Sequence, residues 1–151
     1  MKAPNALLLA TLTGFVLGAA AEPADLAAGR SAWRAAKFVD YEYGYRKYCA
    51  CHPDSPPETI VTVRGGEIVA VRHRPADSTN EVPAKAGSLK YYWTIDELFD
   101  LIASAQRRGA QVRATYDPQR GFPTEIHIDY DKNAIGDELD IVITTVMSLS
   151  H

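Results

Sequence analysis

Hydrophobic and polar residues alternate along much of the chain, a pattern that predicts β-strands. The most marked case begins at Tyr41, where Tyr41, Tyr43 and Tyr45 occupy every second position and therefore share one face of a strand. Runs rich in β-branched and aromatic residues predict five more strands. These are Thr59–Val63, Ile68–Val71, Gln111–Tyr116, Phe122–Tyr130 and Leu139–Met147.

The alternation also assigns the faces of the last two strands. The core-facing positions are predicted to be Ile126, Ile128 and Tyr130, followed by Leu139, Ile141, Ile143 and Met147. The solvent-facing positions of the first of these strands are predicted to be Glu125, His127 and Asp129.

Two stretches follow a helical period instead. Between Ile95 and Arg108 one apolar stripe recurs at helical spacing, and Thr94 and Glu97 have the arrangement of a capping box. Gly109 follows the stretch, as is typical of a helix end. A second helix is predicted from Glu22 to Phe38, with Asp25 as its cap and Trp33 packing on the tyrosine strand.

The elements occur in the order helix, three strands, helix, three strands. Short turns between successive strands favour antiparallel pairing, and Gly65-Gly66 is typical of a hairpin turn. The sequence therefore predicts an α+β fold: a single curved antiparallel sheet of about six strands with two helices on one face. The hairpin around Gly65-Gly66 is expected inside the sheet, and the aperiodic stretch from Arg74 to Lys90 is expected to form a loop.

Residues 1–21 have the features of a secretory signal peptide. Lys2 is followed by an apolar run, and Ala19-Ala20-Ala21 supplies the small residues of a cleavage site. We expect one domain from residue 22 to residue 151, exported to the periplasm or secreted. No integral membrane segment is expected after cleavage, because the apolar run is short and is removed.

The balance of charge narrows the class of partner. The chain carries a formal net charge of −3 and has no run of lysine and arginine. Such a mildly acidic chain is not suited to nucleic acid or to an anionic membrane surface, both of which need a basic patch.

The two cysteines, Cys49 and Cys51, are separated by one residue. In an oxidising compartment two cysteines are expected to pair, so a Cys49–Cys51 disulfide is the favoured interpretation. The spacing lies near the limit for a bridge, because residues two apart in a strand are about 6.5 Å apart at Cα. A redox-active pair, or a soft-metal site formed by both thiolates with His52, therefore remains the alternative.

The segment from Asp129 to Asp140 resembles a calcium-binding loop in its oxygen ligands. The candidate ligands are Asp129, Asp131, Asn133, Asp137 and Asp140. However, Ala134 stands where the loop needs glycine, and Asp140 stands where it needs a bidentate glutamate. A solvated acidic turn is the favoured interpretation. Acid–base chemistry at His127, which lies between Glu125 and Asp129, is likewise weaker than an ordinary solvated strand face.

Tyr91 and Tyr92 end the Arg74–Lys90 stretch and precede Trp93, which has the spacing to pack on Leu98 at the start of a helix. Because tyrosine is a frequent interface anchor, these two residues are candidate binding residues. The alternative is that both tyrosines close the end of the core, which would leave the open sheet face as the interaction surface.

An ordered set of short motifs suggests a family. The set comprises Trp33, Tyr-x-Tyr, Cys-x-Cys, a Val-x-Val hairpin, Thr-Ile-Asp-Glu-Leu-Phe, and Tyr-Asp-x-x-x-Gly-Phe-Pro before Ile-x-Ile-Asp. It resembles a family of small exported bacterial domains classed as a domain of unknown function, over about Trp33 to Ile143. Members of that family often carry proline where this chain has His52. The resemblance implies a fold and a compartment and no activity.

The sequence thus favours a non-enzymatic, exported binding or interaction domain with no cofactor. Its partner is expected to be a protein or a small molecule. The alternative function is a thiol-redox or soft-metal-handling protein centred on Cys49, Cys51 and His52.

Overall fold

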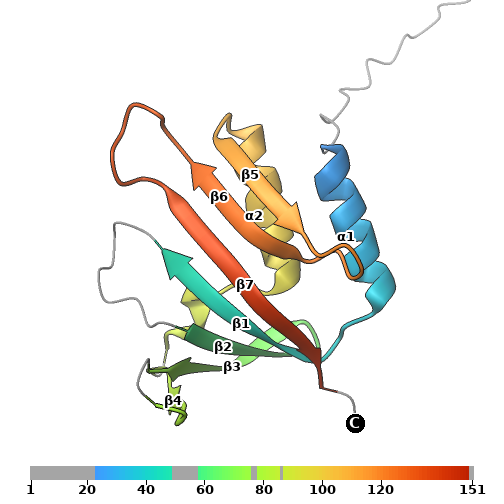
Figure 1. Cartoon of the computed structure of the whole chain (residues 1–151), viewed down its shortest axis with the longest axis vertical. Helices are drawn as coiled ribbons and strands as arrows, with labels where there is room; N and C mark the ends of the chain where they lie inside the picture. Colours follow the sequence, from blue (N-terminus) through green and yellow to red (C-terminus); the bar gives the residue numbers. More distant parts are fainter. Residues whose placement is uncertain (1–22, 49–57, 76–77, 86, 150–151) are drawn as a thin grey trace, which may run out of the picture.

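The computed structural model describes residues 23–48, 58–75, 78–85 and 87–149 of the 151-residue chain. Two helices and seven strands make up one α+β domain, in which every strand pairing is antiparallel (Figure 1). The elements are α1 (Ala24–Ala36), β1 (Tyr41–Tyr48), β2 (Glu58–Arg64), β3 (Glu67–Arg74), β4 (Val82–Pro83), the 3₁₀ turn η1 (Leu89–Tyr91), α2 (Ile95–Arg107), β5 (Gln111–Tyr116), β6 (Pro123–Asp129) and β7 (Leu139–Ser148).

The spatial order of the sheet is β4-β3-β2-β1-β7-β6-β5. The predicted α+β class and antiparallel sheet are confirmed, whereas the count of six strands is one too low. The missing strand is β4, a pair of residues inside the stretch that was expected to be a loop. Two residues are too few to show alternation, so β4 carries no sequence signal of its own.

The order α-βββ occurs twice along the chain, and the three long strands of each half lie in the same spatial sequence, β3-β2-β1 followed by β7-β6-β5. The halves meet where β1 pairs with β7, the last strand of the second half, and β5 lies at the edge. The two central strands therefore come from opposite ends of the described chain, which ties both halves into one sheet.

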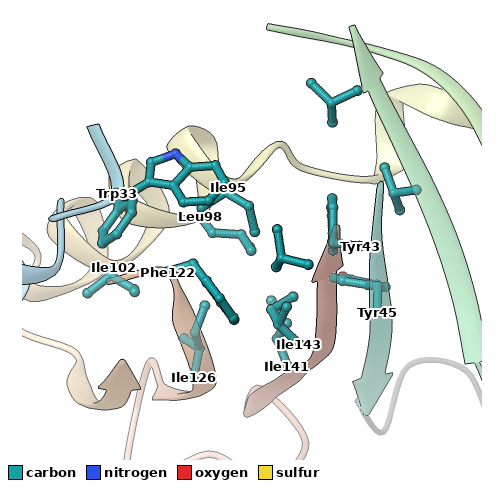
Figure 2. Close-up of a cluster of buried hydrophobic side chains, with 14 of the residues drawn as sticks. Trp33, Tyr43, Tyr45, Ile95, Leu98, Ile102, Phe122, Ile126, Ile141 and Ile143 are labelled. Carbon is teal, nitrogen blue, oxygen red and sulfur yellow. The ribbon is translucent and has the colours of Figure 1, made fainter. Parts of the chain in front are cut away.

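The tyrosines of β1 form the centre of the core, as their spacing predicts. Tyr41, Tyr43 and Tyr45 are each at most 2 % exposed, and Figure 2 shows Tyr43 and Tyr45 within the buried cluster between the sheet and the helices. The hydroxyl groups of Tyr41 and Tyr43 hold the start of α2. Tyr41 Oη accepts a hydrogen bond from the Ile95 amide at 3.0 Å, and Tyr43 Oη donates one to the Trp93 carbonyl. Burial raises the pKa of both phenols, so both stay protonated at neutral pH.

The capping box predicted for α2 is confirmed. Thr94 Oγ1 accepts from the Glu97 amide at 3.2 Å, and Glu97 Oε2 accepts from the Thr94 amide at 2.6 Å. Gly109 has the left-handed φ of 83° that is typical of a helix end. The capping box and the hydroxyl groups of Tyr41 and Tyr43 thus pair backbone groups at the start of α2 and just before it. Without these partners, such groups would be left unpaired.

Helix α1 packs through Trp33, whose ring meets Tyr41 edge-on at 5.2 Å, so the predicted contact with the tyrosine strand is confirmed. Its indole nitrogen also donates to Asp96 of α2 at 3.2 Å. Gly29, which is unfavourable within a helix, has a packing role: a Cβ there would lie 2.7 Å from the Tyr116 ring and 2.9 Å from the Gly121 carbonyl. The close approach of α1 to the β5–β6 turn therefore requires glycine.

Two predictions for α1 are wrong. The helix spans Ala24–Ala36 rather than Glu22–Phe38, because Lys37 adopts the left-handed conformation with φ 55°. Asp25 lies in the first turn and does not cap it; Pro23 is the N-cap, and no side chain caps the helix. Proline fits there because its fixed φ suits the entry into a helix.

The end of β7 departs from simple alternation. Gly44 lies opposite Thr145 and Tyr45 opposite Ile143, so Thr144 is an extra residue in β7. Such a bulge reverses the facing of every later side chain. Val146 is consequently buried, and Met147 is 57 % exposed instead of facing the core. Tyr130 was also predicted to face the core, but β6 ends at Asp129 and the Tyr130 side chain is 42 % exposed.

The predicted hairpin is confirmed, with Gly65 and Gly66 at φ 58° and 84° between β2 and β3. Its interior position holds for β2 only. β3 is covered along Arg72 and His73 by the short β4 and otherwise lies at the edge, where most of its residues are partly exposed.

Neither described helix is long and apolar enough to cross a membrane.

Candidate functional site

The face of the sheet opposite the helices carries the polar side chains of every long strand; we call it the open face. Two transverse rows of open-face positions run from β1 across β7 and β6 to β5, because antiparallel partners point to the same side. The rows are Tyr48–Asp140–His127–Arg113 and Arg46–Val142–Glu125–Thr115.

These rows enclose a depression of about 390 Å³, lined by residues 113–115, 125–127 and 140–142. Its size falls within the range of small-ligand sites, but it opens widely to solvent. The floor is half-buried at His127, Asp140 and Val142, whereas Arg113, Thr115 and Glu125 are exposed around it. The depression is a cradle on a rigid sheet, with three adjacent strands supplying its side chains.

His127 is paired with Asp140 across β6 and β7, at 2.7 Å between Nδ1 and Oδ1. An ionised carboxylate only accepts hydrogen bonds, so Nδ1 carries the proton of this contact. Nε2 of a neutral ring is then an acceptor that Asp140 holds in a fixed orientation. The side chains of His127 and Asp140 are 31 % and 48 % exposed, so both remain available to a bound molecule.

The charges around this pair alternate in sign. Arg113 lies opposite His127 on the β5 side, and Glu125 lies opposite Val142 in the neighbouring row. Toward β1, the exposed Tyr48 adds an aromatic ring beside Asp140, and Arg46 adds a second guanidinium beside Val142. The surface therefore offers donors, acceptors and one aromatic ring within two adjacent rows.

The sequence placed Glu125, His127 and Asp129 on the solvent face, and all three do alternate with the buried Ile126 and Ile128. The partner of His127 is Asp140 and not a neighbour on its own strand. Arg113, Thr115 and Val142 were missed as site residues, because only the register of three strands brings them beside His127. The one signal in the sequence was that these residues alternate with core-facing positions of their strands, which places them on the solvent face.

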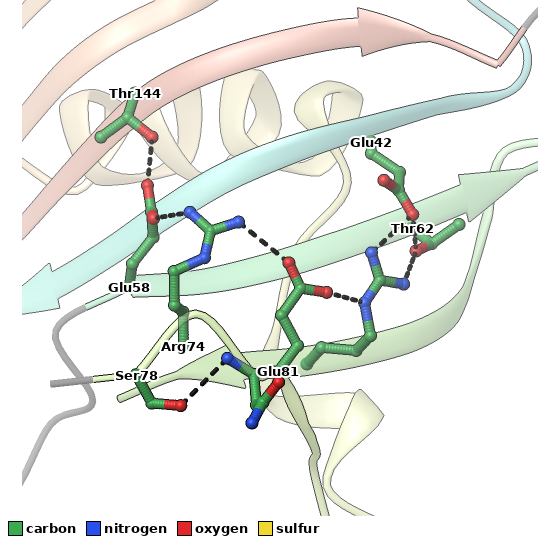
Figure 3. Close-up of polar contacts among 9 residues, drawn as sticks. Glu42, Glu58, Thr62, Arg74, Ser78, Glu81 and Thr144 are labelled. Carbon is green, nitrogen blue, oxygen red and sulfur yellow. Dashed lines mark hydrogen bonds and ion pairs between the residues drawn. The ribbon is translucent and has the colours of Figure 1, made fainter. Parts of the chain in front are cut away.

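The other half of the open face is occupied by a chain of ion pairs (Figure 3). Glu81 accepts from Arg72 at 2.6 Å and from Arg74 at 2.9 Å, which lowers the pKa of Glu81 and raises those of both arginines. Glu42 closes one end of the chain on Arg72, and Glu58 closes the other on Arg74. These pairs hold the segment before β4 against β3, so the charged groups of this half are paired within the protein itself.

The side chains of Tyr91 and Tyr92 have different surroundings. The Tyr92 ring packs on Tyr45 at 5.8 Å and lies 6.3 Å from His73, so it belongs to the rim of the core. Tyr91 is 64 % exposed. Close by, Lys47 lies 5.0 Å above the Trp93 ring, and burial lowers the pKa of the lysine. Whether either tyrosine binds a partner remains a prediction.

Some of the candidate calcium ligands have other partners in the fold. Asp140 lies on β7 and bonds to His127, and Asp131 accepts from the Asn133 amide at 3.0 Å as in a simple turn. Within residues 23–48, 58–75, 78–85 and 87–149, no group of three or more His, Cys, Asp and Glu side chains is placed to hold a metal ion. Cys49, Cys51 and His52 lie outside the described residues, so the disulfide and its alternatives remain predictions.

Comparison with protein families matches the chain to a model described as a family of unknown function, over residues 25–148. Neither curated proteins nor solved structures give a match. The matched segment runs from the first turn of α1 to the last residue of β7, so it includes the whole described fold and the depression. The chain therefore belongs to the Family of unknown function DUF6174.

Proposed function

We propose that this protein is an exported, non-enzymatic binding module, periplasmic or secreted, whose binding surface is the depression on the open face of β5, β6 and β7. The mature chain would begin at Glu22 and carry the Cys49–Cys51 disulfide. The observation that carries the proposal is the asymmetry of the open face. Ion pairs between the protein's own side chains occupy the half over β2 and β3, while the half over β5, β6 and β7 is hollowed, with both apolar and polar side chains in its lining.

The exposure of the His127–Asp140 pair supports binding rather than catalysis. A catalytic histidine–carboxylate pair gains strength from a site that excludes water, because electrostatic interactions are stronger there. This pair lies on an open sheet face and is about one-third to one-half exposed. The hydrogen bond instead fixes the imidazole as part of a preorganised polar surface, and such preorganisation lowers the entropic cost of binding.

The chemistry of the lining indicates a polar ligand or chain segment that carries both donors and acceptors. Within the depression, Arg113 can bind acceptors, and Glu125 and Asp140 can bind donors. Beside it on β1, Arg46 adds another donor and Tyr48 a flat aromatic surface. With opposite charges interleaved, neither a purely anionic nor a purely cationic partner would be well matched. This is consistent with the small net charge of the chain.

Photo-cross-linking in the native compartment tests the proposal. A benzophenone amino acid is placed at Val142, on the half-buried floor of the depression, and in a matched variant at Arg107, on the exposed end of α2. We expect a discrete cross-linked product from Val142 and none from Arg107. The same pattern of products at both positions, or no product at Val142, would show that the depression is not the binding surface.

A further inference from the structure

The two edges of the sheet are protected to very different degrees. At one edge, β4, which contains Pro83, covers β3 along Arg72 and His73, and Glu81 just before β4 is ion-paired to both Arg72 and Arg74. Short strands, proline and charge are the means by which proteins prevent unwanted strand pairing. At the other edge lies β5, and among the described residues no strand pairs with its outer side.

β5 has the properties of a strand that is able to accept a partner. It is six residues long and contains neither proline nor glycine. The extra residue in the β5–β6 ladder is Thr124, on β6, so the outer edge is not distorted by a bulge of its own. A regular edge of this kind presents unpaired backbone donors and acceptors to a partner strand.

The two faces of β5 define what such a partner must look like. On the helix side, Val112, Ala114 and Tyr116 are only half-buried, and Tyr116 stacks on Phe99 at 6.0 Å. A partner strand would cover the exposed parts of this apolar row with apolar side chains of its own. On the open side, Arg113 is the single charged residue of β5, and it is exposed.

A second copy of this chain is a poor occupant of the edge. Two-fold antiparallel pairing of β5 with itself requires that residues on the same face lie opposite one another. In the two registers that best align six-residue strands, Arg113 lies either directly opposite its copy or diagonal to it. Like charges at such positions are destabilising. An acidic residue at that position would instead be attracted to the guanidinium.

We propose that β5 accepts an extended segment of another protein as an eighth strand, in which apolar residues alternate with polar ones and an aspartate or glutamate lies opposite Arg113. This inference rests on the proposed binding function, since Arg113, Ala114 and Thr115 also form one wall of the depression. The backbone ladder would supply affinity, and the Arg113 contact would set the register.

Selection of random ten-residue peptides, displayed on phage, against the mature full chain tests the inference. The enriched peptides are expected to alternate apolar and polar residues, with Asp or Glu at one fixed polar position. Binding should fall at least tenfold in Arg113→Glu and stay unchanged in Arg107→Glu, which reverses a charge on the exposed end of α2. Selection against Arg113→Glu should return Lys or Arg at the fixed position.

Two proline variants test the backbone ladder itself. Successive amides of a strand point to opposite sides, so only one of Ala114→Pro and Thr115→Pro removes an outward N–H. The variant that keeps the melting temperature of the wild type is the informative one, and peptide binding to it should be lost. The peptide-binding measurement on this variant does not depend on the cross-linking at Val142.

Three results would overturn the inference. One is that no peptide is enriched. Another is that the enriched peptides bind the informative proline variant and the wild type with equal affinity but do not bind His127→Ala. That result would place the peptide-binding site in the depression alone. The third is a dimer in sedimentation velocity that the same proline variant dissociates, which would make a second copy the occupant.

Discussion

Thr144 of β7 reaches across Gly44 of β1 and donates a hydrogen bond to Glu58 of β2 at 3.1 Å. The contact spans an entire strand, and it exists because Gly44 has no side chain. A Cβ at Gly44 would overlap Thr144 Oγ1 and lie 3.2 Å from Glu58 Oε1. The bulge at Thr144 and the glycine at position 44 are therefore one feature. It lies between the ion-paired half of the open face, over β2 and β3, and the half that carries the depression.

Gly44→Ala tests this relationship. We expect a loss of about 1–3 kcal/mol in the free energy of unfolding, because an added methyl group forces the surroundings to move. Adding Thr144→Ala should recover part of the loss, since it removes the overlapping hydroxyl. Urea denaturation of the two single variants and the double variant measures the coupling. Additive effects would show that the two residues are independent.

Tyr43→Phe and Tyr45→Phe form a matched pair within one strand. Tyr43 Oη donates to the Trp93 carbonyl, whereas the buried Tyr45 hydroxyl has no hydrogen-bond partner among the described residues. Tyr43→Phe leaves a carbonyl without its partner and should cost about 1–3 kcal/mol, while Tyr45→Phe should be neutral or stabilising. Equal losses in thermal denaturation would mean that Tyr45 has a partner outside the described residues.

Acidification should destabilise the protein partly through His73. Burial lowers the pKa of this ring from its ordinary 6.5, and its Nδ1 lies 3.1 Å from Thr59 Oγ1. The unfolded chain therefore binds a proton at a higher pH than the folded one, so stability falls as the pH drops through 6.5 toward the folded-state pKa.

His73→Gln removes this contribution, and the measurement is the denaturant midpoint at pH 7.5 and at pH 5. The midpoint of the wild type should decrease more between these two values than that of His73→Gln. The difference is expected to be small, because the ring is only partly buried. A larger decrease in the variant would reverse the assigned direction of the pKa shift.

Intact mass spectrometry of the exported protein tests the two proposals that lie outside the described residues. We expect a chain that begins at Glu22, and a mass about 2 Da below that of the dithiol form because the Cys49–Cys51 disulfide has formed. Without a reductant, alkylation should add no group to the protein. After reduction, it should add two groups, one on each cysteine. Retention of residues 1–21 would contradict export with cleavage, and two reactive thiols would favour the redox or metal alternative.

Local patterns predicted the fold well where one strong signal acted alone. The tyrosine alternation, the Thr94–Glu97 capping box and the Gly65-Gly66 turn each define their own element, and the structure contains all three. One of the wrong predictions failed because a residue of another strand intervened. Met147 faces solvent because Thr144 bulges over Gly44, and no pattern within β7 encodes that shift.

The candidate site was less accessible to sequence reasoning for the same reason. His127 could be placed on the solvent face from alternation alone, but its contact with Asp140 depends on the register of β6 against β7. Asp140 was considered only as one candidate ligand of a disfavoured calcium loop, because its neighbours in sequence are acidic. The contribution of Arg113 depends on β5 lying at the sheet edge, and the order of strands in a sheet is not a local property.

The most direct test of the central claim is hydroxyl-radical footprinting of the protein in its native compartment and after purification. Tyr48 borders the depression and is 53 % exposed, while Tyr91 lies in η1 and is 64 % exposed, so the two tyrosines are comparable probes of two surfaces. We predict that Tyr48 is oxidised several-fold more slowly in the native compartment than in the purified protein, and that Tyr91 is oxidised equally in both. Protection of Tyr91 without protection of Tyr48 would contradict the account and move the binding surface to the other side of the sheet.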